Sequence, residues 1–252
     1  MEYKVKEEKK FKYIEEGEGE VMVLLHGLFG ALSNFVEVVE HFSKSYKVII
    51  PILPLYTLPL YDTNLSGLLK HFTRFVKYKK LENIHLLGNS LGGHLGLLFT
   101  LKKPELVKTL SLTGSSGLFE DTLGGSFPKR GNYDYIKERT EHTFYDPKSA
   151  SKELVDEVFE IVNNRHKAIR IISMARSAMK KNLSKELHKI TCPVFLIWGK
   201  QDTITPAYVA KEFERLLPNA HLEFIDKCGH APMMEIPDEF NHVWEKMLSR
   251  IN

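Results

Sequence analysis

The sequence of 252 residues contains only two cysteines, Cys192 and Cys228. Two cysteines are too few for a disulfide framework, and their flanking residues show none of the spacings that bind metal ions. We therefore expect a protein of a reducing compartment, without a structural metal site. The length suits one large α/β domain, or a core domain that carries an insertion.

Long hydrophobic runs are also missing. No segment approaches the run of about 18 apolar residues that a membrane-spanning helix requires. The first ten residues, MEYKVKEEKK, alternate in charge and contain no apolar stretch typical of a signal peptide. These absences predict a soluble, cytoplasmic protein that does not contact a membrane.

The excess of positive charge is small. Lys and Arg total 35 and Asp and Glu total 32, which gives a net charge of +3 at neutral pH. Nucleic-acid-binding proteins usually show a stronger and more clustered basic excess. The basic pairs here, such as Lys9-Lys10 and Lys102-Lys103, are short and indicate solvated surface. We expect a small-molecule substrate and no nucleic acid, while both a monomer and a homodimer remain open.

Short apolar segments alternate with segments of helical periodicity along most of the chain. Strands that are apolar throughout are typical of a parallel sheet covered on both faces, so this alternation predicts a doubly wound α/β fold. The predicted strands are Val21–Leu25, Val48–Ile50, Ile84–Leu87, Thr109–Leu112, Val194–Trp198 and Leu222–Ile225. The predicted helices between them are Asn34–Phe42, Leu65–Tyr78, Leu91–Leu101, Tyr208–Leu217 and Phe240–Ile251.

The alternation stops between Gly117 and Leu187. This region opens with Gly124-Gly125-Ser126-Phe127-Pro128, continues with helical patterns at Ser151–Asn163 and His166–Lys180, and contains no strand-like run. The strand pattern resumes at Cys192-Pro193-Val194. The sequence thus predicts a helical insertion over residues 117–187, between two parts of one core domain at 1–116 and 188–252.

A possible nucleophile lies in the segment Gly88-Asn89-Ser90-Leu91-Gly92. The predicted strand Ile84–Leu87 precedes this segment and an apolar helical run follows it, which is the context that gives a G-x-S-x-G pattern its meaning. The sharp turn would lift the Ser90 hydroxyl clear of the sheet, and Gly88 and Gly92 leave room for it. A Gly-rich turn with an incidental serine is the alternative interpretation.

A serine hydroxyl needs a base and an acid that orients the base, and the chain offers both in the order Ser, Asp, His. Asp202 follows the predicted strand Val194–Trp198, and His230 follows Leu222–Ile225. Both therefore belong to the carboxyl edge of the sheet, where catalytic groups gather. Asp202 could instead cap the next helix, but Thr205 before Pro206 is the better candidate for that cap.

The loop His26-Gly27-Leu28-Phe29-Gly30 follows the first predicted strand. Its glycines allow a close turn, so the backbone N–H of Leu28 could face the same point as that of Leu91 and form an oxyanion hole with it. A plain strand-to-helix loop is the alternative. His26, His85 and His94 are interpreted first as structural residues of a turn, a strand and a helix.

Together these motifs resemble the α/β-hydrolase superfamily. The matching pieces are His26-Gly27 with Gly30, Gly88 to Gly93, Gly199 to Asp202 with Pro206, and Gly229-His230. The resemblance implies a mostly parallel sheet of about eight strands, a triad of Ser90, Asp202 and His230, oxyanion donors from Leu28 and Leu91, no cofactor, and a cap formed by the insertion.

The chain departs from this resemblance in one segment. Many members carry an Asp-x-x-Gly-x-Gly-x-Ser loop after the strand that matches Val48–Ile50, whereas this chain has the apolar, proline-rich segment Pro51–Tyr61. We expect a stiffer loop that lines an apolar pocket. The aromatic residues of the insertion also suggest a substrate of apolar character.

The leading hypothesis is a carboxylic ester hydrolase that acts through an acyl-enzyme. A C–C bond hydrolase of a ring-fission-type diketone acid is the main alternative, and a perhydrolase side activity would use the same triad. Phe29 and Arg176 are the candidate substrate-binding residues, with Arg176 as a carboxylate holder or as an exposed arginine. A non-catalytic binding protein remains possible, whereas Ser90 in place of Asp disfavours dehalogenase chemistry.

Overall fold

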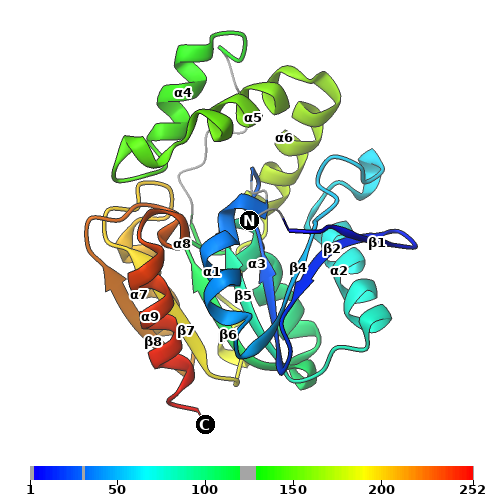
Figure 1. Cartoon of the computed structure of the whole chain (residues 1–252), viewed down its shortest axis with the longest axis vertical. Coiled ribbons are helices and arrows are strands. Elements are labelled where there is room, and N and C mark those ends of the chain that lie inside the picture. The colour runs from blue at the N-terminus through cyan, green and yellow to red at the C-terminus, as the bar shows by residue number, and fades with distance from the viewer. Residues whose placement is uncertain (1–2, 30–31, 120–128, 252) are drawn as a thin grey trace.

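The computed structural model describes residues 3–29, 32–119 and 129–251, and its centre is a twisted sheet with helices on both faces (Figure 1). Gly30 and the segment Gly124–Pro128 lie outside the described residues. The sheet has eight strands in the order β1-β2-β4-β3-β5-β6-β7-β8. The strands are β1 (Lys6–Glu8), β2 (Phe11–Glu16), β3 (Glu20–Leu25), β4 (Tyr46–Pro51), β5 (Ile84–Asn89), β6 (Val107–Thr113), β7 (Val194–Gly199) and β8 (Ala220–Ile225).

The six strands predicted from apolar runs are confirmed as β3 to β8. All six run parallel, with β3 between β4 and β5, so the order reverses beside β3. The predicted doubly wound, mostly parallel α/β sheet is therefore confirmed. In such sheets ligands bind at the carboxyl edge beside this reversal.

Strands β1 and β2 were not predicted. They form an antiparallel pair, and β2 continues antiparallel onto β4 at the edge of the sheet. β1, with the sequence Lys6-Glu7-Glu8, is the exposed edge strand of the sheet, and β2 combines buried Phe11, Tyr13 and Ile14 with charged residues. Apolar runs therefore do not mark strands of this kind.

Helices cover both faces, and alternate residues of the central strands supply the two cores. Leu24, Leu87 and Ile197 pack on one face with α1 (Val36–Phe42) and α9 (Pro237–Leu248). Val23, Leu86 and Trp198 pack on the other face with the remaining core helices. These are α2 (Leu65–Lys79), α3 (Leu91–Lys102) and α7 (Ala207–Leu216). None of the helices in the described ranges is long and apolar enough to cross a bilayer.

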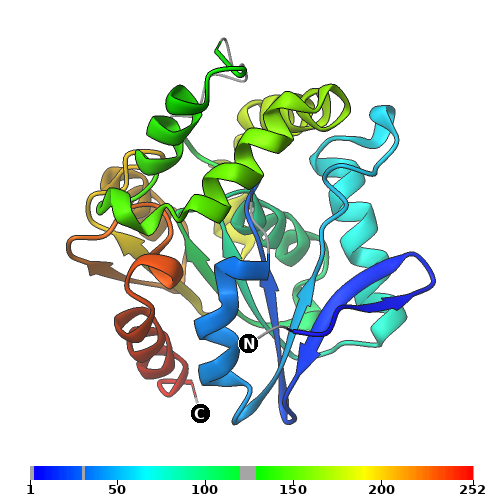
Figure 2. The same ribbon diagram turned by 45° about the horizontal axis from the view of Figure 1, so that its top comes forward.

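Three helices from the predicted insertion lie together beyond the carboxyl edge of the sheet (Figures 1 and 2). They are α4 (Tyr133–Glu141), α5 (Lys152–Asn163) and α6 (Arg165–Lys180). Helices α5 and α6 match the predicted segments within a residue. Helix α4 was not predicted, because it buries only Ile136 and Thr140 and so has a weak apolar pattern. The short helix α8 (Pro232–Glu235) was also not predicted.

The first part of the proline-rich segment Pro51–Tyr61 packs into the core, whereas Leu60 and Tyr61 at its end are exposed. Leu53 and Leu55 are buried in the core cluster that contains β3 and α2, and Tyr56 and Leu58 pack against it. The amide of Leu53 donates a hydrogen bond to Nε2 of His26. The expectation that this segment lines the substrate pocket is wrong for the cavity described below, because apolar side chains gain more from the closed core.

Candidate active site

Ser90 occupies the turn between β5 and α3, with backbone dihedral angles of φ 54° and ψ −120°. This left-handed φ is costly for a residue with a side chain, and such strain gathers at functional sites. The turn is held because the Ser90 amide donates to the carbonyl of Thr113 while the Ser90 carbonyl accepts from the amide of His94. The predicted strand–turn–helix context of Ser90 is therefore confirmed.

The glycines around Ser90 are required by close backbone contacts. A Cβ at Gly92 would lie 2.0 Å from the carbonyl oxygen of Leu25, and one at Gly88 would lie 2.5 Å from that of Gly92. These separations are far below any van der Waals contact. Because Gly88 and Gly92 have no side chains, the turn that contains Ser90 can pack closely against the end of β3. This packing brings Ser90 beside the loop that follows β3.

His230 and Asp202, predicted as base and acid, lie within hydrogen-bond distance. The Nδ1 atom of His230 is 2.9 Å from Oδ2 of Asp202, and both side chains are buried. Because a carboxylate only accepts hydrogen bonds, Nδ1 of His230 carries the proton that it donates to Asp202, and in the neutral imidazole Nε2 is then an acceptor. This is the tautomer that a general base needs.

The Asp202 carboxylate receives several donors besides His230. Its Oδ1 accepts from the amides of Ile204 and Thr205, and its Oδ2 accepts from the Thr205 hydroxyl at 2.8 Å. Helix α7 begins after Pro206 and has no side-chain cap. The expectation that Thr205 caps this helix is thus wrong, since its hydroxyl and amide are directed to Asp202.

Asn89 links the Ser90 turn to the His230 loop, a role that no sequence pattern predicted. Its Nδ2 donates to the carbonyls of Thr113 and His230, each at 3.1 Å. The His230 amide donates to the carbonyl of Thr143, so the His230 backbone is held on both sides. The position of Asn89 directly before Ser90 was the available signal.

Glu235 also holds the backbone of the His230 loop, and no sequence pattern predicted this role. Its carboxylate accepts from the amides of Gly229 and Tyr145, each at 2.7 Å. Burial raises the pKa of Glu235. The residue thereby joins the His230 loop to the start of the segment that follows α4.

Leu28 and Leu91, predicted as oxyanion donors, lie in the loop after β3 and at the first position of α3. Leu91 opens α3, so its amide has no partner within the helix. Leu28 follows Gly27, where a Cβ would lie only 3.2 Å from Cβ of Ser90. Both residues and Ser90 line one cavity. The positive end of α3 at this point favours a developing negative charge.

The three histidines interpreted as structural are buried, and each contacts residues other than Asp202. His26 bridges Gly27 and Leu53, and burial lowers its pKa. His85 contacts Thr109 and Glu20 near the opposite end of β5. His94 lies within α3, and burial lowers its pKa to about 4.

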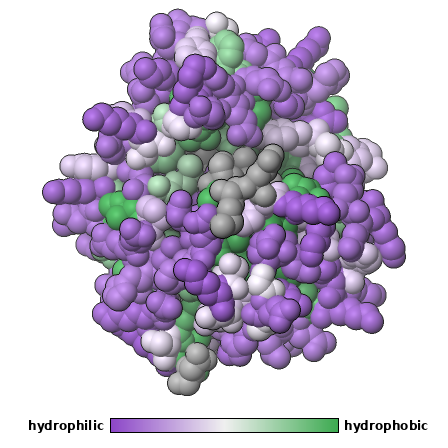
Figure 3. Space-filling model, in the orientation of Figure 1, coloured by the Kyte–Doolittle hydropathy of each residue, from purple (hydrophilic) through white to green (hydrophobic). Residues whose placement is uncertain are grey.

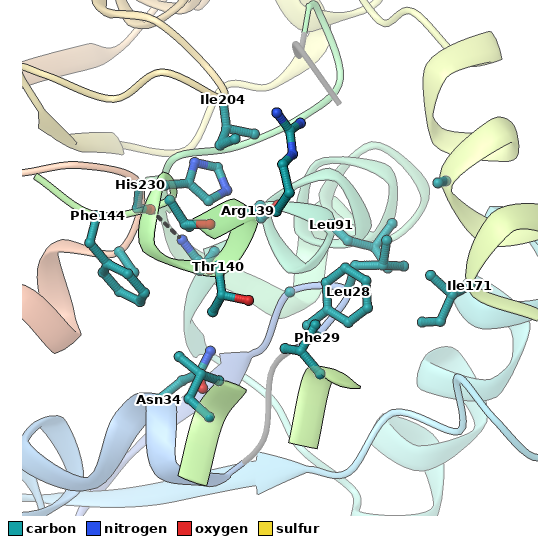
Figure 4. Close-up of a pocket in the computed structure, with 18 of the residues that line it drawn as sticks. Leu28, Phe29, Asn34, Leu91, Arg139, Thr140, Phe144, Ile171, Ile204 and His230 are labelled. Carbon is teal, nitrogen blue, oxygen red and sulfur yellow. Dashed lines mark hydrogen bonds between the residues drawn. The ribbon is translucent and has the colours of Figure 1, made fainter. Parts of the chain in front are cut away.

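A cavity of about 180 Å³ opens over Ser90 and His230, between the core and helices α4 to α6 (Figure 4). An apolar protein cavity of roughly 150 Å³ takes up benzene, so this one accommodates a substrate group of at least that size. On the face seen in Figure 3, apolar side chains gather between these helices and the core. The apolar lining residues are Leu28, Phe29, Leu91, Ile136, Phe144, Leu154, Val158, Ile171, Ile172, Ala175, Ala178, Ile204, Ala231 and Met234.

Of the two predicted substrate-binding residues, the structure places one at the cavity. Phe29 lines it, whereas Arg176 is exposed on α6 and does not. Helix α6 turns Ile171, Ala175 and Ala178 inward, and this spacing leaves Arg176 on the solvent side. The assignment of Arg176 as a carboxylate holder is corrected accordingly. The arginine that lines the cavity is Arg139, on the unpredicted helix α4.

Comparison with known families agrees with this geometry. The model of the Alpha/beta hydrolase family matches residues 22–243. The chain belongs to the α/β-hydrolase family. The match spans the Ser90 turn, the Asp202 loop and the His230 loop, so the resemblance expected from the motifs is confirmed.

Similar proteins within the α/β hydrolases include different activities. A 2-hydroxy-6-oxo-6-(2'-aminophenyl)hexa-2,4-dienoic acid hydrolase of Metapseudomonas resinovorans is 27% identical, over 95% of this chain and 87% of its own length. Lipase 1 of Psychrobacter immobilis is 26% identical, over 91% of this chain and 78% of its own length. A dienoic acid hydrolase and a lipase are thus both similar to this chain.

Solved structures support the same family. An α/β hydrolase enzyme from the metagenome of sediments of the Mar Chica lagoon in Morocco is 44% identical, with a TM-score of 0.81 and 98% of each chain covered. A meta-cleavage product hydrolase from Pseudomonas fluorescens IP01 has a TM-score of 0.84 at 21% identity, covering 96% of this chain and 95% of its own, which shows the shared fold.

Proposed function

We propose that this α/β hydrolase is a serine esterase that cleaves a small, partly apolar carboxylic ester through an acyl-enzyme. The observation that carries the proposal is the buried hydrogen bond between His230 and Asp202, at the cavity that Ser90 also lines. Ser90 is the nucleophile, His230 the general base and Asp202 the group that orients it.

The chemistry follows from these positions. Nε2 of His230 removes the hydroxyl proton of Ser90 as its oxygen attacks the ester carbonyl. The tetrahedral intermediate collapses, and His230 passes the proton to the departing alkoxide. Water then attacks the acyl-enzyme with His230 again as base, which releases the carboxylic acid and restores Ser90.

The oxyanion of each tetrahedral intermediate would face the backbone amides of Leu28 and Leu91. Donors fixed before the reaction stabilise charge at no cost of reorganisation, and removing one such donor typically lowers the rate by a factor of roughly 100 or more. The strained turn at Ser90 serves this purpose, since it holds the nucleophile at the first amide of α3.

Hydrolysis of p-nitrophenyl butyrate by the wild-type chain and by Ser90→Ala tests the proposal. We expect Ser90→Ala to lose more than about 99.9% of kcat, because the remaining groups only bind and polarise the ester. Wild-type protein should also react covalently with a fluorophosphonate probe. Ser66→Ala, at an exposed serine of α2 that does not line the cavity, is the control and should keep the wild-type turnover. Retained turnover in Ser90→Ala would refute the assignment.

A C–C bond hydrolase of a ring-fission-type diketone acid is the second candidate. It is favoured by the similarity to the dienoic acid hydrolase, which extends over 95% of this chain. A direct comparison of kcat/KM for a dienoic diketone acid and for p-nitrophenyl esters separates the two. Faster cleavage of the diketone acid, with weak ester turnover, would select the second candidate.

A further inference from the structure

Arg139 is the single permanently charged side chain among the described residues that line the cavity. No aspartate or glutamate accompanies it in that lining, which is mostly apolar. A cation in such surroundings is weakly screened, so it interacts strongly with any anion that enters. The charge therefore influences which molecules the cavity accepts.

The guanidinium of Arg139 has an unmet hydrogen-bonding need. Its Nε atom is buried and has no hydrogen-bond partner. Buried donors without partners are rare in folded proteins, because each forgoes the hydrogen bonds that it makes with water. An unpaired donor on a charged group that faces a substrate cavity indicates that a ligand supplies the acceptor.

The position of Arg139 on α4 explains why the side chain turns inward. Ile136 lies one helical turn before Arg139 and Thr140 follows it directly, and both line the cavity. In the view of Figure 4, the guanidinium lies on the Ile204 side, whereas Phe29 and Ile171 lie on the other side. The cavity thus has a charged end and an apolar end.

We propose that Arg139 binds a carboxylate of the substrate, so that the enzyme prefers esters that carry a free acid group on a short apolar chain. This inference rests on the proposed esterase function and names its substrate class. A guanidinium matches a carboxylate through two parallel N–H donors. A phosphate dianion fits less well, because the described lining offers no second permanent cation to balance it.

The test compares release of p-nitrophenolate from two substrates that differ at one end, p-nitrophenyl hydrogen glutarate with a free carboxylate and p-nitrophenyl methyl glutarate with a neutral methyl ester in its place. The measured quantity is the ratio of kcat/KM for the acid to kcat/KM for the methyl ester. We expect Arg139→Met to lower this ratio roughly ten- to hundredfold, as for the loss of a buried charge-assisted hydrogen bond. Arg139→Lys keeps the positive charge but not the two parallel N–H donors of the guanidinium, so it should lower the ratio less.

Arg176→Met is the matched control, because it removes an exposed arginine from neighbouring helix α6. Its ratio should equal that of the wild type. The proposal is overturned if Arg139→Met leaves the ratio within about twofold of wild type, or if Arg176→Met lowers it equally. The second result would assign the preference to net charge rather than to a site.

A binding measurement separates this inference from the proposed function. Calorimetric titration of Ser90→Ala and of the double variant Ser90→Ala, Arg139→Met with hexanoate and with hexanamide requires no turnover. Tighter binding of hexanoate that is lost in the double variant supports the carboxylate site even if neither ester is cleaved, a result that would refute only the esterase. Equal binding of the two ligands, with active wild-type enzyme, would refute the carboxylate site alone.

Discussion

The hydroxyl of Thr205 donates a hydrogen bond of 2.8 Å to Oδ2 of Asp202. This is the carboxylate oxygen that also faces Nδ1 of His230, and Thr205 is completely buried. Thr205 therefore acts through Asp202 as a positioning residue, fixing the plane of the carboxylate toward the imidazole.

Replacing Thr205 by valine removes this donor at nearly constant volume. We expect kcat for p-nitrophenyl butyrate to fall about tenfold, the effect of one hydrogen bond to a charged group, while KM changes little. Thr205→Ser retains the hydroxyl and should recover most of the activity. A rise in KM without loss of kcat, or no recovery in Thr205→Ser, would indicate a packing role instead.

Gly92 and Gly96 lie one turn apart on α3 and should respond differently to alanine. A Cβ at Gly92 would meet the Leu25 carbonyl oxygen at 2.0 Å, whereas one at Gly96 would meet a methyl group of Leu110 at 3.2 Å. Backbone cannot yield easily, but the end of a leucine side chain can. We expect Gly92→Ala to cost at least about 3 kcal/mol of unfolding free energy.

Gly96→Ala is the matched control for Gly92→Ala. Alanine is the better helix former by about 1 kcal/mol, which offsets the tighter contact, so Gly96→Ala should change stability by less than about 1 kcal/mol. Urea denaturation followed by circular dichroism measures both variants. Equal stability of Gly92→Ala and Gly96→Ala would contradict the close packing of the Ser90 turn against β3.

His94 makes the protein sensitive to acid. Burial lowers its pKa to about 4 in the folded chain, below the value of 6.5 of a free side chain. Its contribution to stability is therefore complete above pH 6.5 and is lost as the pH falls toward 4. From these values, the free energy of unfolding should be about 2 kcal/mol lower at pH 5 than at pH 7 through His94.

The variant His94→Gln tests this pH dependence, since glutamine does not titrate. Its loss of stability between pH 7 and pH 5 should be smaller than that of the wild type by about 2 kcal/mol. His221→Gln, at an exposed histidine, should retain the wild-type loss. Denaturation curves recorded at pH 7 and pH 5 give the free energy of unfolding of each variant. An unchanged pH dependence of this free energy in His94→Gln would exclude His94 as its cause.

The sequence by itself determined the parallel core and the elements that carry the candidate triad. Buried parallel strands are apolar along most of their length, so the central strands β3 to β7 could be predicted, as could the turn that contains Ser90. The apolar residues of β8 at the edge of the sheet were sufficient to predict that strand as well. Ser90, Asp202 and His230 follow the parallel strands β5, β7 and β8, which predicted that they lie at one edge of the sheet. The contact between Asp202 and His230 agrees with that order.

Only the tertiary structure decided which side chains surround the candidate site. Arg176 and Arg139 both belong to the insertion, but the packing of α4 and α6 turns Arg139 inward and leaves Arg176 in water. Thr205 suits a helix cap by sequence, yet it donates to Asp202 across the loop. Local patterns encode strands and helices, whereas the direction of a side chain in a cap depends on how helices distant in sequence pack together.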